Sequence, residues 1–155
     1  MAAPTFIGVH WYNRPQTLGQ CSFQLHSFLQ KLQQHNAQVY GHWFEQANSK
    51  AKALTKPLVG DYTAVMKAFG TKARESDYPA TSFGLSLWNG ALNDEEGIVL
   101  RVSLGSSEKK LYPNSCTLDL YQNQDCQAFY ANSHHVQELE KLFSSFWQPE
   151  KLILQ

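Results

Sequence analysis

The sequence lacks a long apolar run, since none approaches the ~20 consecutive apolar residues of a membrane-spanning helix. The opening segment, Met1 to Val9, also lacks the basic region and apolar stretch of a secretory signal. We therefore expect a cytoplasmic protein without a membrane partner. A chain of 155 residues fits one domain, residues 1–155, and can bury roughly two-thirds of its unfolded surface.

An excess of either charge is missing as well. Thirteen basic and thirteen acidic residues cancel, whereas domains that bind nucleic acid usually carry a basic stripe and a high pI. We expect no direct binding of DNA or RNA. The three cysteines, Cys21, Cys116 and Cys126, form no CxxC pair, which argues against a disulfide framework or a zinc site. On a helix, His134 and His135 would point about 100° apart, so they do not form a metal site either.

Familiar catalytic motifs are also missing. The chain has no GxSxG, GxxxxGKS/T, HExxH or GxGxxG pattern. We therefore predict no catalytic residue, no cofactor and no enzymatic turnover. Two alternatives stay open. One is a small enzyme or ligand-binding domain that uses a pocket formed by His10, Trp11, His42 and Trp43, and the other is a generic scaffold or adaptor domain.

Apolar periodicity predicts a helix near each end of the chain. Thr17 and Gln20 form a capping box ahead of the first helix. Its apolar stripe consists of Leu18, Cys21, Leu25, Phe28, Leu29 and Leu32. The last helix is expected to run from a cap at Ser133 to about Trp147, and Pro149 ends it. Its apolar face consists of Val136, Leu139, Leu142, Phe143 and Phe146.

A further helix is predicted in the middle of the chain. Asp61 can cap it, and it is expected to run to about Ala68 and to end near Gly70. Its inward-facing residues should be Tyr62, Val65, Met66 and Phe69. The polar, lysine-rich residues 48–60 before it predict irregular surface, with room for a short helix over residues 49–54.

Four segments have the alternation of a strand: residues 5–11, 81–88, 97–104 and 115–121. The last three follow one another through short links, which favours an antiparallel meander. Residues 39–44 are aromatic and fit either a strand or an extended loop. This order of elements predicts an α+β fold, in which helices pack on one side of an antiparallel sheet made of the meander and the N-terminal strand.

The other side of that sheet is predicted to be polar and aromatic. Trp88, Arg101, Asp119 and Tyr121 fall on it by the period of two. Arg101 and Asp119 are expected to pair across neighbouring strands. Two interpretations of Trp88 stay open, because tryptophan is usually buried beneath a helix or loop but is also enriched at binding hot spots.

The connection after Trp88 carries the densest acidic run of the chain. Asn89 and Gly90 form a turn, and Asp94, Glu95 and Glu96 follow it. Acidic groups beside an aromatic anchor favour a surface that meets a basic partner, and charges of this kind mainly set encounter rate and specificity. A solvated hairpin loop is the alternative. We predict partner-binding residues at Trp88, Asn89, Asp94, Glu95, Glu96, Arg101, Asp119 and Tyr121.

Several segments together resemble a known pattern. They are Trp11-Tyr12-Asn13-Arg14, Trp43-Phe44 with Ala51 to Leu54 and Pro57-Leu58, Phe83 to Gly90, Ser115 to Leu120, and Phe146-Trp147-Gln148-Pro149. In this order they resemble immunity protein family 52 of the bacterial polymorphic toxins. The sequence of Leu87 to Gly90 is the most specific of these matches.

The resemblance implies an α+β protein that neutralises a cognate toxin, often a nuclease with a restriction-endonuclease-like domain delivered by a system such as type VI secretion. The chain would bind the toxin without turnover and would protect the producing cell. Zero net charge argues against mimicry of DNA over the whole surface. A local acidic patch with aromatic anchors is therefore expected. The resemblance does not decide whether Trp11, Trp43, Trp88 and Trp147 are structural or interfacial, nor the oligomeric state.

Overall fold

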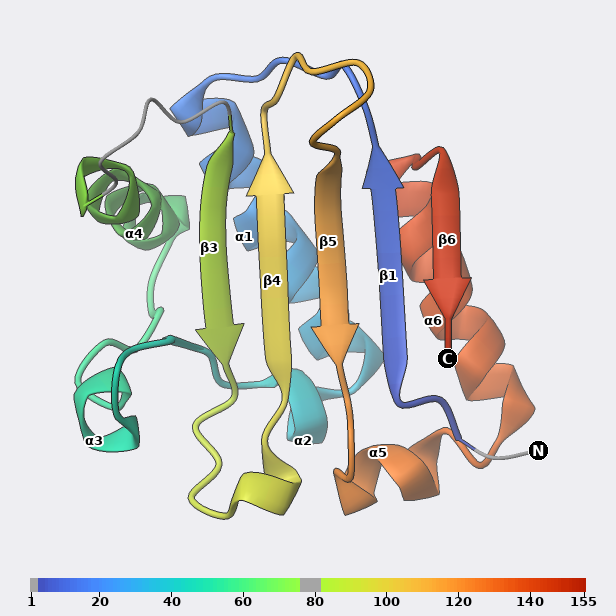
Figure 1. The fold of residues 1–155 in the computed structure, drawn as a ribbon. Coiled ribbons are helices and arrows are strands. Elements are labelled where there is room, and N and C mark those ends of the chain that lie inside the picture. The colour runs from blue at the N-terminus through green and yellow to red at the C-terminus, as the bar shows by residue number, and fades with distance from the viewer. Residues whose placement is uncertain (1–2, 76–81) are drawn as a thin grey trace.

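The computed structural model describes residues 3–75 and 82–155, and its centre is a six-stranded antiparallel sheet (Figure 1). The strands lie side by side in the order β2-β3-β4-β5-β1-β6. Their bounds are β1 Phe6–Trp11, β2 Phe44–Glu45, β3 Phe83–Trp88, β4 Val99–Leu104, β5 Asn114–Asp119 and β6 Lys151–Leu154. The predicted meander is β3-β4-β5, and the N-terminal strand β1 lies beside β5. The expected start of β3 at Thr81 lies outside the described residues.

The helices that are long enough to form a layer all lie behind the sheet in the view of Figure 1. These are α1 (Leu18–His35), α4 (Tyr62–Glu75) and α6 (Ser133–Trp147). The short elements are α2 (Ala37–Tyr40), α3 (Lys50–Ala53), α5 (Gln124–Phe129) and a 3₁₀ turn, η1 (Asp94–Glu96). The α+β class with helices on one side is therefore confirmed.

The core lies between this helical layer and the sheet. Strand register places Ile7, Leu118, Leu100 and Leu87 in one row across four strands, and none of the four is exposed to solvent. From the helices, Leu25, Phe28, Phe69, Leu139 and Phe143 are buried against the sheet. Each fully buried side chain of this kind stabilises the fold by about 1.5 to 3 kcal/mol. The apolar face of the sheet is therefore held against the helices, and the opposite face points outward.

We call that other face the open face. Its rows are Gly8, Thr117, Arg101 and Ser86, and next to it Phe6, Asp119, Val99 and Trp88. No long helix of residues 3–75 and 82–155 covers the open face, which faces the viewer in Figure 1. The predicted alternation of the meander strands is therefore confirmed on both faces.

Two predicted elements differ from the structure, the middle helix and residues 39–44. The middle helix does not end at Gly70 but continues to Glu75, because Gly70 does not adopt the positive φ that a glycine helix stop requires. Tyr62 is 36% exposed rather than inward-facing. The ambiguous residues 39–44 divide into the end of α2 and the start of β2. The predicted capping box of α1 and the short helix after Ser49 are both present.

Two elements were not predicted, α5 and β6. Asn123 caps α5 by accepting a hydrogen bond from Cys126 N at 2.9 Å, but this six-residue helix is too short for an apolar period. After α6, Gln148 adopts a left-handed conformation with φ 46°, and the chain turns back to pair with β1. Leu152 and Ile153 in β6 are both half-buried, so the strand lacks the alternation that identifies a strand.

A tryptophan pair joins the two ends of the chain. The rings of Trp11 and Trp147 stack with centroids 5.3 Å apart, and the Arg14 guanidinium lies 5.0 Å from the Trp11 ring. Arg14 also donates hydrogen bonds to the carbonyl oxygens of Trp147 at 2.5 Å and Gln148 at 2.8 Å. We call Trp11, Arg14 and Trp147 the Trp11 clamp. It satisfies the last carbonyls of α6, which otherwise have no helical partner.

Candidate functional site

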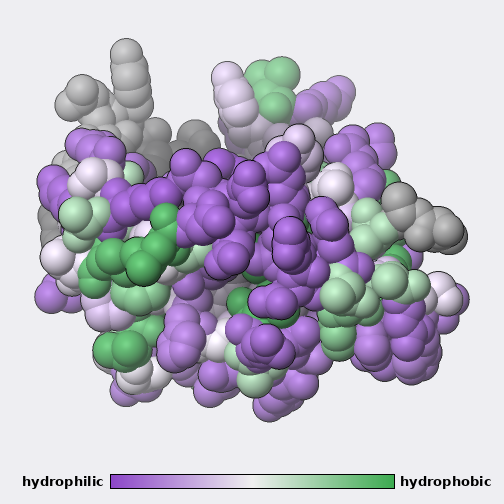
Figure 2. All heavy atoms as spheres, turned by 90° about the horizontal axis from the view of Figure 1, so that it is seen from below, coloured by the Kyte–Doolittle hydropathy of each residue, from purple (hydrophilic) through white to green (hydrophobic). Residues whose placement is uncertain are grey.

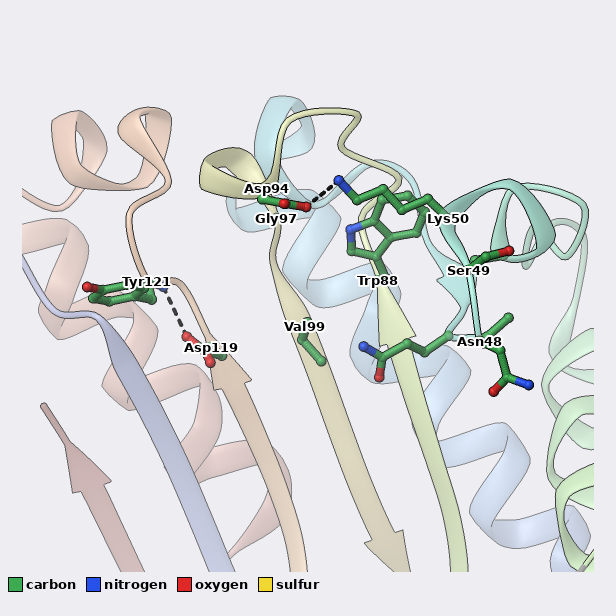
Figure 3. A pocket seen from close by; sticks show the side chains of 12 residues that line it. Asn48, Ser49, Lys50, Trp88, Asp94, Gly97, Val99, Asp119 and Tyr121 are labelled. Carbon is green, nitrogen blue, oxygen red and sulfur yellow. Dashed lines mark hydrogen bonds and ion pairs between the residues drawn. The ribbon is translucent and has the colours of Figure 1, made fainter.

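A pocket of about 410 Å³ lies at the edge of the open face where β3 and β5 end (Figure 3). We call it the Trp88 pocket. The row Trp88, Val99 and Asp119 spans its floor from β3 to β5. Its walls come from residues 46–50 on one side and from the β3–β4 connection on the other, and Tyr121 follows β5 at its rim.

Local packing explains why the Leu-Trp-Asn-Gly segment ends β3. The Trp88 ring packs against Phe44 of β2, with ring centroids 6.1 Å apart, and only 8% of the residue is exposed. Gly90 follows at φ 82°, and a Cβ there would lie 2.5 Å from Phe44 Cε2. Glycine is therefore required twice, by the backbone angle and by the closeness of the Phe44 ring.

Asn89 shapes the acidic connection rather than lining the pocket. Its Oδ1 accepts from Ile98 N at 3.0 Å and its Nδ2 donates to Glu96 O at 3.0 Å. Asn123, which precedes α5, donates to the same carbonyl at 2.7 Å. These bonds fix the connection between β3 and β4 as a compact loop beside α5.

Charge in the Trp88 pocket is uneven. Lys50 forms an ion pair with Asp94 across the mouth, above the Trp88 ring in Figure 3, and it donates to Leu92 O at 3.2 Å. The second carboxylate, Asp119, is half-buried and accepts a hydrogen bond from Tyr121 N at 3.1 Å. No cationic side chain of residues 3–75 and 82–155 forms an ion pair with Asp119.

Four of the eight predicted partner-binding residues line the pocket: Trp88, Asp94, Asp119 and Tyr121. The other four do not line it. Glu95 and Glu96 are exposed on η1, Asn89 holds the loop, and Arg101 is exposed on the neighbouring row of the open face. The contact of these residues with a partner stays a prediction.

The expected pairing of Arg101 with Asp119 is wrong. Register places Arg101 opposite Thr117 and Asp119 opposite Val99, and no ion pair joins the two among the described residues. The pattern assigned both to the right face but could not fix the strand offset. The sequence pattern did not predict that Lys50 lines the Trp88 pocket, because the composition of residues 48–60 is typical of irregular polar surface.

The end of the molecule that carries the β3–β4 connection and α5 is largely hydrophilic (Figure 2). Apolar side chains visible there form small, separate groups. Leu92 is one exposed apolar residue of the connection, at 79% exposure. A partner at this end therefore meets mainly polar and charged groups, with the Trp88 pocket as a recessed aromatic feature.

The alternative pocket of His10, Trp11, His42 and Trp43 does not form. Three strands separate β1 from β2 in the sheet. Trp11 is buried against Trp147, whereas Trp43 is buried against Tyr40, with ring centroids 6.4 Å apart. The enzyme alternative that depended on this pocket therefore loses its structural basis.

The cysteines are buried and unpaired by disulfides. Burial raises the pKa of Cys21 to about 11 and that of Cys126 to about 12, and it raises the pKa of Cys116 well above its ordinary value. Such thiols carry little thiolate at neutral pH, so they are poor nucleophiles.

Within residues 3–75 and 82–155, no three His, Cys, Asp or Glu side chains gather in a way that could hold a metal ion. Over the same ranges, no helix combines the length and the apolar character needed to cross a bilayer.

Comparison with known proteins gives one result. The model of a protein family described as Immunity protein 52 matches residues 4–153, which is nearly the whole chain. No curated protein matches the sequence. The match includes the Trp11 clamp, the Leu87 to Gly90 segment and every strand except the last residue of β6.

Proposed function

Since the chain belongs to the Immunity protein 52 family, we propose that it binds a cognate bacterial toxin and neutralises it by protein–protein interaction, without turnover. The observation that carries this proposal is the extent of the family match, residues 4–153. Such a protein protects the cell that produces both toxin and inhibitor. The family description names the immunity role but does not name the chemistry of the toxin.

We further propose that the toxin is a nuclease with a restriction-endonuclease-like domain, delivered by a system such as type VI secretion. A nuclease must carry cationic groups to hold a phosphate backbone. Its inhibitor would act in the cytoplasm, where the nucleic acid is, and would contact the nuclease rather than the nucleic acid. Zero net charge on the inhibitor means that complementarity would be local.

The contact region in this proposal is the open face with the β3–β4 connection. Its central residues are Trp88, Asn89, Asp94, Glu95, Glu96, Arg101, Asp119 and Tyr121. The open face supports this choice because no long helix of the described residues covers it. A standard interface buries about 1,600 Å² in total, and a six-stranded sheet face with adjoining loops offers that kind of area.

Co-expression with the toxin encoded beside the gene tests the proposal. We expect the chain to restore growth of cells that express the active toxin. We also expect it to co-purify at a fixed ratio with a toxin variant inactivated at its catalytic site. The inactive toxin separates binding from survival, since cells tolerate it.

Loss of growth rescue together with loss of co-purification, for a chain shown to be folded by circular dichroism, would contradict the proposal. Rescue at substoichiometric amounts of the chain would contradict the absence of turnover. Direct binding of nucleic acid by the chain in a filter assay would contradict the proposal that its partner is the toxin protein.

A further inference from the structure

The carboxylates of the Trp88 pocket outnumber its cations. Asp94 and Asp119 line it with the single ammonium group of Lys50, which is paired with Asp94. Asp119 accepts from Tyr121 N through Oδ1, and its Oδ2 has no hydrogen-bond partner among the described residues. The pocket therefore offers an acceptor with negative charge that the chain itself does not neutralise.

A second observation is independent of these charges. Trp88 is 92% buried, as its exposed fraction is 8%, yet its indole Nε1 has no hydrogen-bond partner within residues 3–75 and 82–155. In Figure 3 the nitrogen points toward the side of the pocket where Asp94 and Val99 lie. The indole nitrogens of Trp11, Trp43 and Trp147 are enclosed in the core without a partner among the described residues. Trp88 Nε1 is not enclosed in this way and stays open to the pocket, so it can donate a hydrogen bond to an occupant.

The occupant must then combine a cation with a hydrogen-bond acceptor. A guanidinium group matches a carboxylate with two parallel hydrogen bonds and also stacks on aromatic faces. Tyr121, which is 61% exposed, supplies such a face next to Asp119, on the side of Asp119 that is farther from Trp88 in Figure 3. A main-chain carbonyl beside the cationic side chain supplies the acceptor for Trp88 Nε1.

We propose that the Trp88 pocket receives an arginine side chain of the partner. Its guanidinium contacts Asp119 and the Tyr121 ring, and the main-chain carbonyl of the same segment accepts a hydrogen bond from Trp88 Nε1. The identity of the partner as a toxin rests on the proposed function. The preference of the pocket for a guanidinium does not, because it follows from the pocket alone.

The test uses the purified chain without any toxin. The probe is N-acetyl-L-arginine amide, and the matched probe is N-acetyl-L-citrulline amide, which keeps the shape and loses the charge. Binding is followed by the four tryptophan indole N–H signals in ¹⁵N-labelled protein, with the Trp88 signal assigned from Trp88→Phe. We expect the Trp88 signal to shift and arginine to bind at least tenfold more tightly, about 1.4 kcal/mol.

Two variants with the same chemical change sharpen the result. Asp119→Asn removes the proposed charge and should abolish the preference for arginine over citrulline. Asp125→Asn changes an exposed aspartate of α5 that does not line the pocket, and the preference should persist. Equal binding of the two probes, a preference that survives Asp119→Asn, or no shift of the Trp88 signal up to the solubility of the probe would overturn the proposal.

The two proposals can fail separately. A chain that binds the arginine probe through Asp119 but does not rescue growth keeps the pocket preference and loses the immunity role. A chain that rescues growth and co-purifies with the toxin, yet shows no arginine preference, keeps the immunity role and loses this inference.

Discussion

The Trp11 clamp and the Trp88 pocket are both built around a tryptophan that ends a strand, yet they differ in how their charged groups are paired. At the clamp, Arg14 lies over the Trp11 ring and donates to two carbonyl oxygens at the end of α6. At the pocket, no cationic side chain among the described residues pairs with Asp119. The indole nitrogens do not separate the two places, because those of Trp11 and Trp147 have no hydrogen-bond partner in the described part of the chain either. The cation of the clamp serves the groups around it, whereas the cation of the pocket, Lys50, pairs with Asp94 and leaves Asp119 without an ion pair within residues 3–75 and 82–155.

This difference separates two roles that an aromatic segment can have in the fold. Both Trp11 to Arg14 and Leu87 to Gly90 lie within the family match. The first closes the fold by joining β1 to α6, which are far apart in the sequence. The second also shapes local structure through Phe44 and Gly90, but it leaves polar groups facing solvent. A motif of aromatic residues thus reports the fold in one place and a candidate site in the other.

The largest expected effect comes from emptying the clamp. Trp147 is fully buried and contacts Trp11 and Phe28, so Trp147→Ala should lower the free energy of unfolding by about 3 to 5 kcal/mol. Urea denaturation measures this. Phe23→Ala, at a residue 59% exposed, is the control and should change stability little. A small loss for Trp147→Ala would contradict the structural role of the clamp.

A smaller effect is expected from the cation of the clamp. Arg14→Ala removes two hydrogen bonds from a charged donor and should cost about 1.5 to 3 kcal/mol. Arg14→Lys keeps the charge but loses the planar fork, so it should restore only part of the stability. If Arg14→Lys were as stable as the parent in urea denaturation, charge alone would explain the clamp.

Gly90→Ala probes the pocket side of the comparison. The positive φ and the Phe44 ring both oppose a Cβ, so the loss of stability should exceed about 1 kcal/mol. Gly60→Ala is a matched control, because Gly60 has φ 94° but nothing within 4 Å of an added Cβ. The difference between the two variants in thermal and urea denaturation isolates the contact with Phe44. Equal losses of stability in the two variants would show that the Phe44 ring moves aside without a measurable cost.

The smallest effect on stability is expected from the acidic connection. Asp94, Glu95 and Glu96 are exposed, and the Lys50–Asp94 pair lies at the surface, where such pairs contribute about 0 to 1 kcal/mol. Replacing all three residues by Ser should hardly move Tm. It should weaken toxin binding and reduce its dependence on salt, because exposed charges act over a Debye length of about 8 Å.

Isothermal titration at low and high salt measures this last effect. A Glu95→Ser, Glu96→Ser variant keeps the Lys50–Asp94 pair and serves as the comparison. If the triple variant bound and protected as well as the parent at both salt concentrations, the connection would be ordinary surface.

The sequence predicted what depends on local pattern. The α1 capping box at Thr17 and the two faces of the meander strands follow from spacing alone. The offset between β4 and β5 does not, which is why the pairing of Arg101 with Asp119 was wrong. The edge strand β6 was not predicted because its consecutive residues Leu152 and Ile153 are both half-buried, so the alternation of a strand is missing.

The candidate site shows the same division. Trp88, Asp94, Asp119 and Tyr121 were identified from the strand pattern and the acidic run, and they line one pocket. Lys50 was not identified, because its position in the pocket depends on how β2 and the residues after it pack beside β3. Long-range contacts of this kind leave no mark in a single sequence.

One affinity measurement tests whether the toxin binds the open face, as proposed, rather than the helical layer. Thr117→Arg places a long cationic side chain in the middle of the open face, between Arg101 and Gly8 in register. Ser144→Arg places the same side chain on the exposed surface of α6. With both variants folded, Thr117→Arg should raise the Kd for inactive toxin about 100-fold, or about 2.7 kcal/mol, and Ser144→Arg should leave it nearly unchanged. Retained affinity in Thr117→Arg with loss in Ser144→Arg would contradict binding at the open face and would place the interface on the helices.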